Sequence, residues 1–195
     1  MSKIIFKDIR KCSLEQKKRI RKIRNQKKVR KFMYTDHIIS EKEHQTWLEN
    51  IQGDNSNIFF LILMNNLILG CVSANKINWI HKTSGWAFYL DEDYRGGLGA
   101  AVEYHFINFV FNKLKLKKLN SEVIETNDTL INMHKNFGFI EEGIIKYNIY
   151  KNKRRLNVFL LGMTDKEWKI KKKVISKEFL FILNKFKIEI EYENE

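Results

Sequence analysis

Hydrophobic and polar residues follow two periods along this chain, one typical of strands and one typical of helices. Short apolar or alternating runs predict strands at residues 4–9, 58–64, 67–77, 85–90, 119–124, 139–150 and 156–163. Helical spacing predicts helices at residues 14–24, 40–51, 98–113 and 129–137. Ser40 and Glu43 have capping-box spacing, which predicts where the second helix begins. Strands joined by long helices, with a final hairpin, predict an α/β fold whose mixed, mostly antiparallel sheet is flanked by helices.

The length of 195 residues fits one domain with a sizeable core, and a hydrophobic content of 44% indicates a globular protein. The predicted elements end near residue 165, so we expect a domain of residues 1–165 and a basic, apolar C-terminal extension of residues 166–195. Trp168, Phe179 and Phe186 make this extension too apolar for a disordered end. We expect it to form a helix packed on its own domain or on a partner, which leaves a homo-oligomer through the extension as an open alternative.

The two cysteines, Cys12 and Cys71, are too few and too isolated for a disulfide framework or a zinc site, so we expect no metal. The longest apolar run, residues 58–64, has the length of a strand and is far shorter than a membrane span. The first residues contain no apolar stretch of signal-peptide length. These features predict a cytoplasmic protein without a membrane partner.

A glycine-rich segment follows the strand predicted at residues 85–90 and opens the helix at residues 98–113. Glycines allow a tight curl in which several backbone N–H groups converge, and the helix N-terminus and Arg95 add positive charge. This combination predicts a pyrophosphate cradle, and an ordinary glycine turn is the alternative. The segment is not a Walker A loop, because no Gly-Lys-Ser/Thr follows. It is not a dinucleotide fingerprint, because Val102 stands where a third glycine belongs.

Two segments together resemble the GNAT family of N-acetyltransferases. The glycine-rich loop matches the family form Gln/Arg-x-x-Gly-x-Gly/Ala when aligned on Gly97 and Gly99, although Tyr94 occupies the first position. Residues 127–142, NDTLINMHKNFGFIEE, match a second family segment, with His134 where a tyrosine is usual. The resemblance implies the acetyl-CoA N-acyltransferase fold over roughly residues 4–165 and acetyl-CoA as co-substrate.

The resemblance also implies a site for acetyl-CoA and a catalytic residue. Backbone groups would bind the pyrophosphate at Arg95, Gly96, Gly97, Leu98, Gly99 and Ala100, and the pantetheine at Phe88, Tyr89 and Leu90. Asn127 would hold the CoA arm, with a role as helix N-cap as the alternative or additional function. His134 would protonate the CoA thiolate, unless it is only a packed helix residue. Independently of the resemblance, Glu122 can face the cleft if Val123 faces the core. It would then accept the amine proton directly or through water, unless it is only a solvated strand carboxylate.

The N-terminal third resembles one branch of this family, the sugar-nucleotide acetyltransferases of pseudaminic acid synthesis. The resemblance rests on Arg24-Asn25, on MYTDH at residues 33–37, on EHxxW at residues 43–47 and on the predicted hairpin at residues 76–82. Members of that branch acetylate the 4-amino group of UDP-4-amino-4,6-dideoxy-N-acetyl-β-L-altrosamine, so the resemblance implies a UDP-amino-sugar partner.

The residue types in these segments suit such a substrate. Met33, Tyr34 and Trp47 can form an apolar wall against uracil and a sugar methyl group. Arg24, Lys76 and His44 can contact a diphosphate or sugar hydroxyls, and Trp86 would line the acceptor side. The alternative is that these aromatic residues only close the core. A protein N-terminal acetyltransferase and a non-catalytic, nucleic-acid-binding relative remain competing functions.

The formal net charge of +13 bears on the last of these alternatives. Lysine and arginine dominate residues 10–31, where Glu15 is the single acid. Such density can indicate nucleic-acid binding, but no recognition motif accompanies it, and we expect no nucleic-acid partner. A positive field would equally attract CoA and a nucleotide-linked substrate, since both are polyanions.

Overall fold

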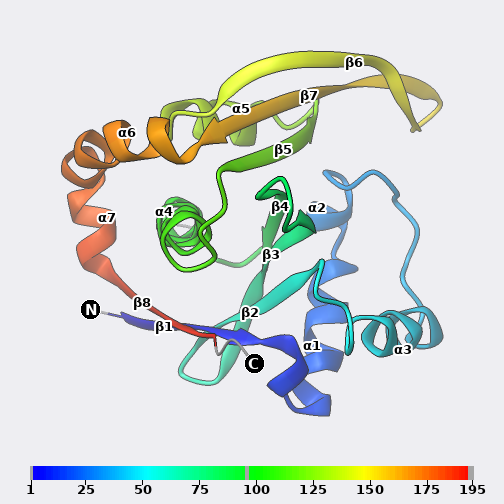
Figure 1. Cartoon of the computed structure of the whole chain (residues 1–195). Coiled ribbons are helices and arrows are strands. Elements are labelled where there is room, and N and C mark those ends of the chain that lie inside the picture. Colours follow the sequence, from blue (N-terminus) through cyan, green and yellow to red (C-terminus); the bar gives the residue numbers. More distant parts are fainter. Residues whose placement is uncertain (1, 95–96, 193–195) are drawn as a thin grey trace.

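The computed structural model describes residues 2–94 and 97–192, and within them one twisted sheet of eight strands forms the centre of the molecule (Figure 1). The strands are β1 (Ser2–Asp8), β2 (Ile58–Met64), β3 (Leu67–Asn78), β4 (Thr83–Leu90), β5 (Lys118–Ile124), β6 (Ile140–Lys151), β7 (Arg154–Thr164) and β8 (Phe186–Glu191). Their spatial order is β6-β7-β5-β4-β3-β2-β1-β8. Only the β4–β5 and β1–β8 pairs among these neighbours are parallel, which confirms the predicted mixed, mostly antiparallel α/β fold.

Helices cover both faces of this sheet. They are α1 (Leu14–Arg24), α2 (Lys27–Arg30), α3 (Glu41–Asn50), α4 (Leu98–Asn112), α5 (Asp128–Asn136), α6 (Asp165–Glu178) and α7 (Leu180–Lys185), together with a 3-10 turn at Ile9–Lys11. The alternation of β2 separates the two faces, because successive side chains of a strand point to opposite sides. Phe60 and Ile62 belong to the core beneath α4, whereas Leu61 and Leu63 pack with α1 and α3.

Local sequence signals explain several element boundaries. Ser13 and Ser40 each cap a helix through a capping box with the residue three positions on, as the spacing at Ser40 predicts. Asn65 and Asn66 form the turn between β2 and β3 with positive φ angles of 49° and 64°, the geometry that tight hairpin turns require. No helix among residues 2–94 and 97–192 is long and apolar enough to cross a membrane.

The extension of residues 166–195, as far as it is described, packs on its own domain and continues the same sheet. Trp168 of α6 is 1% exposed in the main core, and α7 leads to β8, which pairs in parallel with β1 (Figure 1). The prediction of a helix for this segment is therefore incomplete, since residues 186–191 form an edge strand. Their pairing with residues 2–7 is a contact between the two ends of the described chain, and local periodicity carries no information about it.

Candidate active site

The site lies where two neighbouring parallel strands separate. β4 and β5 pair only between Thr83–Gly85 and Lys118–Asn120, so the rest of β4 has no partner on its β5 side. On its other side, β4 stays paired with β3 as far as Leu90. The free backbone groups between Trp86 and Leu90 can bind a ligand in extended form, because unpaired strand edges present N–H and C=O groups in a row. This is the separation that the proposed pantetheine site at Phe88, Tyr89 and Leu90 requires.

Two cavities adjoin along this gap. The larger, the acceptor cavity, has a volume of about 660 Å³ and extends between α1, α3, β4, β5 and the loop after α2. The smaller, the donor groove, measures about 450 Å³ and lies between the end of β4 and α5. The residues that line both are Phe32, Met33, Phe88, Tyr89, Asn127 and Leu130. Two ligands held in these spaces would meet at this shared wall.

The donor groove contains the four residues expected to bind the pantetheine and the CoA arm. Phe88, Tyr89, Leu90 and Asn127 all line it. Asn127 is the residue before α5, but its side chain makes no capping hydrogen bond and is therefore available to a ligand. Asn127 is also the N-cap of α5 by position, through its backbone carbonyl, which accepts from the N–H groups of Leu130 and Ile131.

The turn after β4 is tied to α1 and to the residue before α2. Arg19 Nη2 lies 2.6 Å from Asp91 Oδ2, and Gln26 Nε2 lies 3.0 Å from Asp91 Oδ1. Asp91 is 2% exposed, whereas the Arg19 side chain is 44% exposed, and the two bonds hold the entry to the glycine-rich loop. The acidic turn is recognisable in sequence, but its partners Arg19 and Gln26 are not.

The glycine-rich loop leads into α4 with a left-handed residue. Gly97 has φ +91° and is the N-cap of α4, and a Cβ there would lie 3.0 Å from Ile182 Cδ1 of α7. A Cβ at Gly99 would make only ordinary contacts, the nearest 3.7 Å from Phe88. Leu98 and Ala100 are buried at the start of the helix, whose first N–H groups have no helical acceptor. The expected contributors Arg95 and Gly96 lie outside the described residues.

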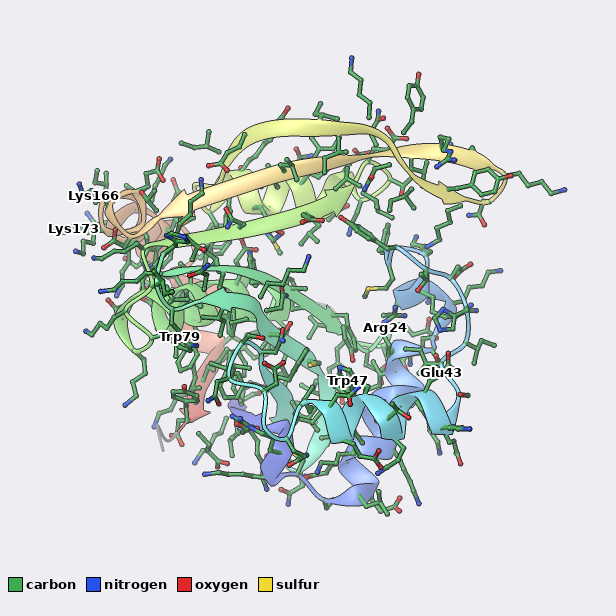
Figure 2. All side chains as sticks on the ribbon, turned by 45° about the vertical axis from the view of Figure 1, so that its right-hand side comes forward. Arg24, Glu43, Trp47, Trp79, Lys166 and Lys173 are labelled. Atoms are coloured by element: carbon green, nitrogen blue, oxygen red, sulfur yellow. The ribbon has the colours of Figure 1, made fainter. Side chains whose placement is uncertain are left out.

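The acceptor cavity brings together most of the expected substrate residues. Arg24, Met33, Tyr34, His44, Trp47 and Trp86 line it, and so do Glu122 and His134. Figure 2 shows Arg24, Glu43 and Trp47 on the same side of the molecule, whereas Lys166 and Lys173 lie on α6 at the far side. Lys76 is exposed near the end of β3 and lines neither cavity, so the structure does not bring this expected contact to the site.

Aromatic side chains form one wall of the acceptor cavity. The rings of His44 and Trp47 lie 5.3 Å apart, and Trp47 meets Phe59 edge-on at 5.0 Å. Trp47 and Met33 also pack against the core beneath α1 and α3, so they close the core and line the cavity together. Burial lowers the pKa of His44, and Arg21 lowers it further. His44 is therefore a neutral side chain that can accept or donate one hydrogen bond near neutral pH.

Arg24 lines this cavity, and within the described part of the chain its guanidinium group lacks a hydrogen-bond partner at one nitrogen. Its Nη1 atom is buried and has no hydrogen-bond partner among the described residues, and burial lowers its pKa. Arg21, in contrast, donates to Glu41 Oε1 at 2.6 Å and to the carbonyl of Ile39 at 3.2 Å. An unpaired buried guanidinium nitrogen is costly, which makes it a favourable site for an anionic ligand group.

Tyr34 and Glu122 close the cavity from opposite sides. The Tyr34 hydroxyl donates to Glu122 Oε2, which joins the loop after α2 to β5. Burial and this hydrogen bond raise the pKa of Tyr34 well above its usual range. Glu122 is exposed to solvent and also lines the cavity. Its position is therefore compatible both with a solvated strand carboxylate and with a group that faces the acceptor.

Trp86 belongs mainly to the core. It is 3% exposed and stacks with Phe88, Phe106 and Phe139 at centroid distances of 5.5, 5.7 and 6.0 Å. It also lines the acceptor cavity, as expected. Its Nε1 atom is buried without a partner among the described residues, a second donor that a ligand oxygen could engage.

His134 is held from both sides of its ring. Its Nδ1 lies 2.8 Å from Glu103 Oε1 and its Nε2 lies 3.2 Å from Ser121 Oγ. It is 1% exposed and packs against Trp86 and Phe139 at 5.0 and 5.1 Å. Burial raises the pKa of Glu103, while His134 lowers it in part. Sequence reasoning missed Glu103 and Ser121, although a glutamate among the apolar positions of the helix at residues 98–113 is a signal that could have found Glu103.

Comparison with known proteins agrees with this geometry. Residues 9–159 match the profile of the family described as acetyltransferase (GNAT) domain. The SPbeta prophage-derived uncharacterized N-acetyltransferase YokL of Bacillus subtilis is 24% identical over 132 residues, which cover 67% of this chain and 75% of that protein. Acetyltransferase PseH of Campylobacter jejuni is 25% identical over 131 residues, which cover 67% of this chain and 81% of PseH.

Solved structures share the fold. The crystal structure of spermidine N-acetyltransferase from Vibrio cholerae in complex with CoA and spermine superposes with a TM-score of 0.76 at 18% identity. The match covers 81% of this chain and 95% of that one. Because the family profile spans most of the chain, the chain belongs to the GNAT acetyltransferase family and is an acetyl-CoA-dependent N-acetyltransferase.

Proposed function

We propose that this chain transfers the acetyl group of acetyl-CoA to the 4-amino group of a UDP-4-amino-4,6-dideoxy sugar. The specific acceptor is UDP-4-amino-4,6-dideoxy-N-acetyl-β-L-altrosamine, in pseudaminic acid synthesis. The observation that carries this proposal is the incomplete pairing of Arg24 beside an aromatic wall in a cavity of about 660 Å³. The match to PseH at 25% identity agrees with the branch that the N-terminal motifs resemble.

The charges of the acceptor cavity support an anionic ligand. Its two glutamates already accept hydrogen bonds: Glu43 from the backbone of Ser40 at 2.7 Å, and Glu122 from Tyr34. Among the described residues that line this cavity, the charged side chain with a buried, unpaired atom is the cation Arg24. A diphosphate can satisfy a guanidinium through charge-assisted hydrogen bonds, each contributing roughly 1.5–3 kcal/mol. A polyamine such as the spermine of the Vibrio cholerae complex would place further cations beside Arg24.

The apolar residues support a base and a methyl group as the other parts of the ligand. Met33, Trp47 and Phe59 provide thioether and aromatic surface on one wall. Burying about 100 Å² of uracil and sugar methyl surface there would contribute on the order of 2.5 kcal/mol. A peptide N-terminus would instead need an open groove with backbone partners, which makes a protein N-terminal acetyltransferase the second function to test.

Acetyl-CoA would occupy the donor groove and the glycine-rich loop, with its thioester reaching past the shared wall into the acceptor cavity, which Ser121 and His134 line. The unpaired edge of β4 would bind the pantetheine, and Asn127 would contact the CoA arm. The amine proton would pass to Glu122, whose exposure lets it exchange protons with water. Assembly into a homo-oligomer is compatible with this proposal, and a Vibrio cholerae relative of the same fold is described as dodecameric.

The test is a panel of acceptors at one acetyl-CoA concentration, followed by thiol release. It contains the UDP-4-amino sugar, the same amino sugar without UDP, spermidine and peptides with free N-termini. We expect the UDP-sugar to have the highest kcat/KM. Higher turnover of spermidine or of a peptide would refute the proposal.

Substitution of Arg24 then tests the charge argument. Arg24→Gln should raise KM for the UDP-sugar by about tenfold or more, because it removes a charge-assisted bond to the diphosphate. KM for the amino sugar without UDP should change little. Lys22→Gln is the matched control, since Lys22 is an exposed cation on the same helix.

A further inference from the structure

Three side chains from three elements form a buried row of hydrogen bonds that ends at the acceptor cavity. Glu103 comes from α4, His134 from α5 and Ser121 from β5. Their exposed fractions are 0%, 1% and 6%, and the row runs from Glu103 Oε1 through both ring nitrogens to Ser121 Oγ. His134 and Ser121 line the cavity, whereas Glu103 does not.

The arrangement bears on how His134 could protonate a ligand. Both of its ring nitrogens are engaged, one by Glu103 and the other by Ser121. A serine hydroxyl can accept one hydrogen bond and still donate its own hydrogen. If Nε2 carries a hydrogen, it donates to Oγ, and the hydroxyl hydrogen of Ser121 is free to point into the cavity. The Oγ atom of Ser121 is then the group through which a proton leaves this row of hydrogen-bonded side chains.

The burial of Glu103 indicates that the hydrogen-bonded pair of Glu103 and His134 retains a shared proton. Glu103 Oε2 is buried and has no partner among the described residues, so a full carboxylate charge would be poorly compensated there. Burial also raises the pKa of Glu103, which favours the protonated carboxyl. The proton can sit on the carboxyl beside a neutral imidazole or on the imidazole beside a carboxylate. In both forms Nε2 carries a hydrogen.

We propose that Ser121 protonates the departing CoA thiolate and that the Glu103–His134 pair supplies the proton. This rests on the acetyl transfer proposed above, but not on the identity of the acceptor amine. The amine nitrogen bonds to the thioester carbon, the C–S bond breaks, and its electron pair goes to sulfur. Sulfur takes the hydroxyl proton of Ser121, and Oγ takes the proton from His134 Nε2. The amine proton passes to Glu122, and the pair regains its proton from water after the products leave.

Among the described neighbours of His134, Glu103 is the acidic partner. The groups packed against the ring from other elements are Glu103, Ser121, Trp86 and Phe139. Among these described neighbours only Glu103 has an acidic side chain, and it shares one proton with His134. Glu103 is thus a positioning residue, since it acts through His134, while Ser121 touches the reacting sulfur.

The first test measures the proton directly and needs no activity. In ¹⁵N-histidine-labelled protein, with His134 assigned by comparison with His134→Gln, we expect Nε2 to carry a hydrogen at neutral pH. In Glu103→Gln, the amide oxygen should accept from Nδ1–H, so Nε2 should lose its hydrogen. A wild-type Nε2 without hydrogen would overturn the proposal, because Ser121 would then donate to His134 and not to sulfur.

The second test measures turnover with whichever amine of the panel is acetylated. Ser121→Ala should lower kcat by about 10²-fold, the usual scale for losing a proton donor, with KM for acetyl-CoA within about twofold. Ser121→Thr keeps the hydroxyl and should recover most of the activity. Ser84→Ala is the control, because Ser84 is a buried serine of the neighbouring strand whose hydroxyl donates to the carbonyl of Gly85. A kcat for Ser121→Ala within twofold of wild type would also overturn the proposal.

The dependence of kcat on pH distinguishes a positioning role of Glu103 from a role in packing alone. Wild-type kcat should fall as pH rises and the Glu103–His134 pair loses its shared proton, and Glu103→Gln should move this fall to lower pH. A purely structural role for Glu103 would lower stability and leave the position of the fall unchanged. If the UDP-sugar fails but a peptide or polyamine is acetylated, the acceptor assignment fails and these tests proceed with the other amine.

Discussion

Lys151, at the end of β6, holds the loop after α2 over the site. Its Nζ atom donates to the carbonyl oxygens of Arg30, Lys31 and Met33 at 2.8, 2.9 and 2.8 Å. The residue is 6% exposed, and Met33 and the following Tyr34 line the acceptor cavity. Lys151→Met keeps the apolar stem and removes the ammonium, so it tests the three bonds with little loss of packing.

The magnitude follows from two opposing terms. Three hydrogen bonds to a charged group, at roughly 1.5 kcal/mol each, amount to about 4.5 kcal/mol. Burial lowers the pKa of Lys151, which means that desolvation of the ammonium offsets much of this gain. We therefore expect a net loss of about 1–2 kcal/mol in the closed state of the loop. This corresponds to a rise in acceptor KM of roughly 5- to 30-fold.

The assay compares KM for the acceptor with KM for acetyl-CoA and follows amide hydrogen exchange over residues 31–37. We expect the acceptor KM to rise more, because Tyr34, Thr35 and His37 line only the acceptor cavity of the two. Exchange in this loop should become faster. Lys146→Met, an exposed change on the same strand, is the control. Unaltered KM values together with unaltered exchange would refute the reasoning.

Three further changes test other parts of the site. Gly97→Ala should lower the free energy of unfolding by about 1–2 kcal/mol, because a residue in the left-handed conformation acquires a Cβ against Ile182. Gly99→Ala is the control and should change the free energy of unfolding little. Equal effects of the two substitutions in thermal or denaturant unfolding would contradict this prediction. Gly99→Val should weaken acetyl-CoA binding tenfold or more in calorimetry, since its bulk would hinder close approach of the pyrophosphate, and an unchanged affinity in the folded variant would rule out the loop as the cradle. Trp47→Ala should raise KM for the UDP-sugar far more than for acetyl-CoA, since Trp47 lines only the acceptor cavity of the two; an equal rise for both substrates would show that it acts through general packing.

Features carried by local sequence were predictable. The capping box at Ser40 and the turn at Asn65 and Asn66 depend on neighbouring residues, so their geometry follows from a few positions. The helix after the glycine-rich loop was predicted because its apolar residues recur with helical spacing. The cavity-lining positions of Met33 and Trp47 were also expected, although this expectation came from resemblance and not from periodicity.

Contacts between distant segments were not predictable in this way. Lys151 is one of many lysines, and no pattern around it indicates that it binds three carbonyls more than a hundred residues away. The edge strand β8 is short and charged, and it becomes a strand because β1 offers an unpaired edge. Lys76 lies outside both cavities because the β3–β4 pair carries it to an exposed position.

The sequence by itself determined the α/β class, the presence of a glycine-rich loop at the start of a helix, and the order of strands and helices from β1 to β7 apart from the short α2. These are local properties, set by side-chain periodicity and by the backbone freedom of glycine. Only the tertiary structure decided which side chains meet. His134 lies 13 positions from Ser121 and 31 from Glu103 in the chain, and they come together because α4, α5 and β5 pack around one core. Burial in that core gives Glu103 its raised pKa, a property of its surroundings that no stretch of sequence contains.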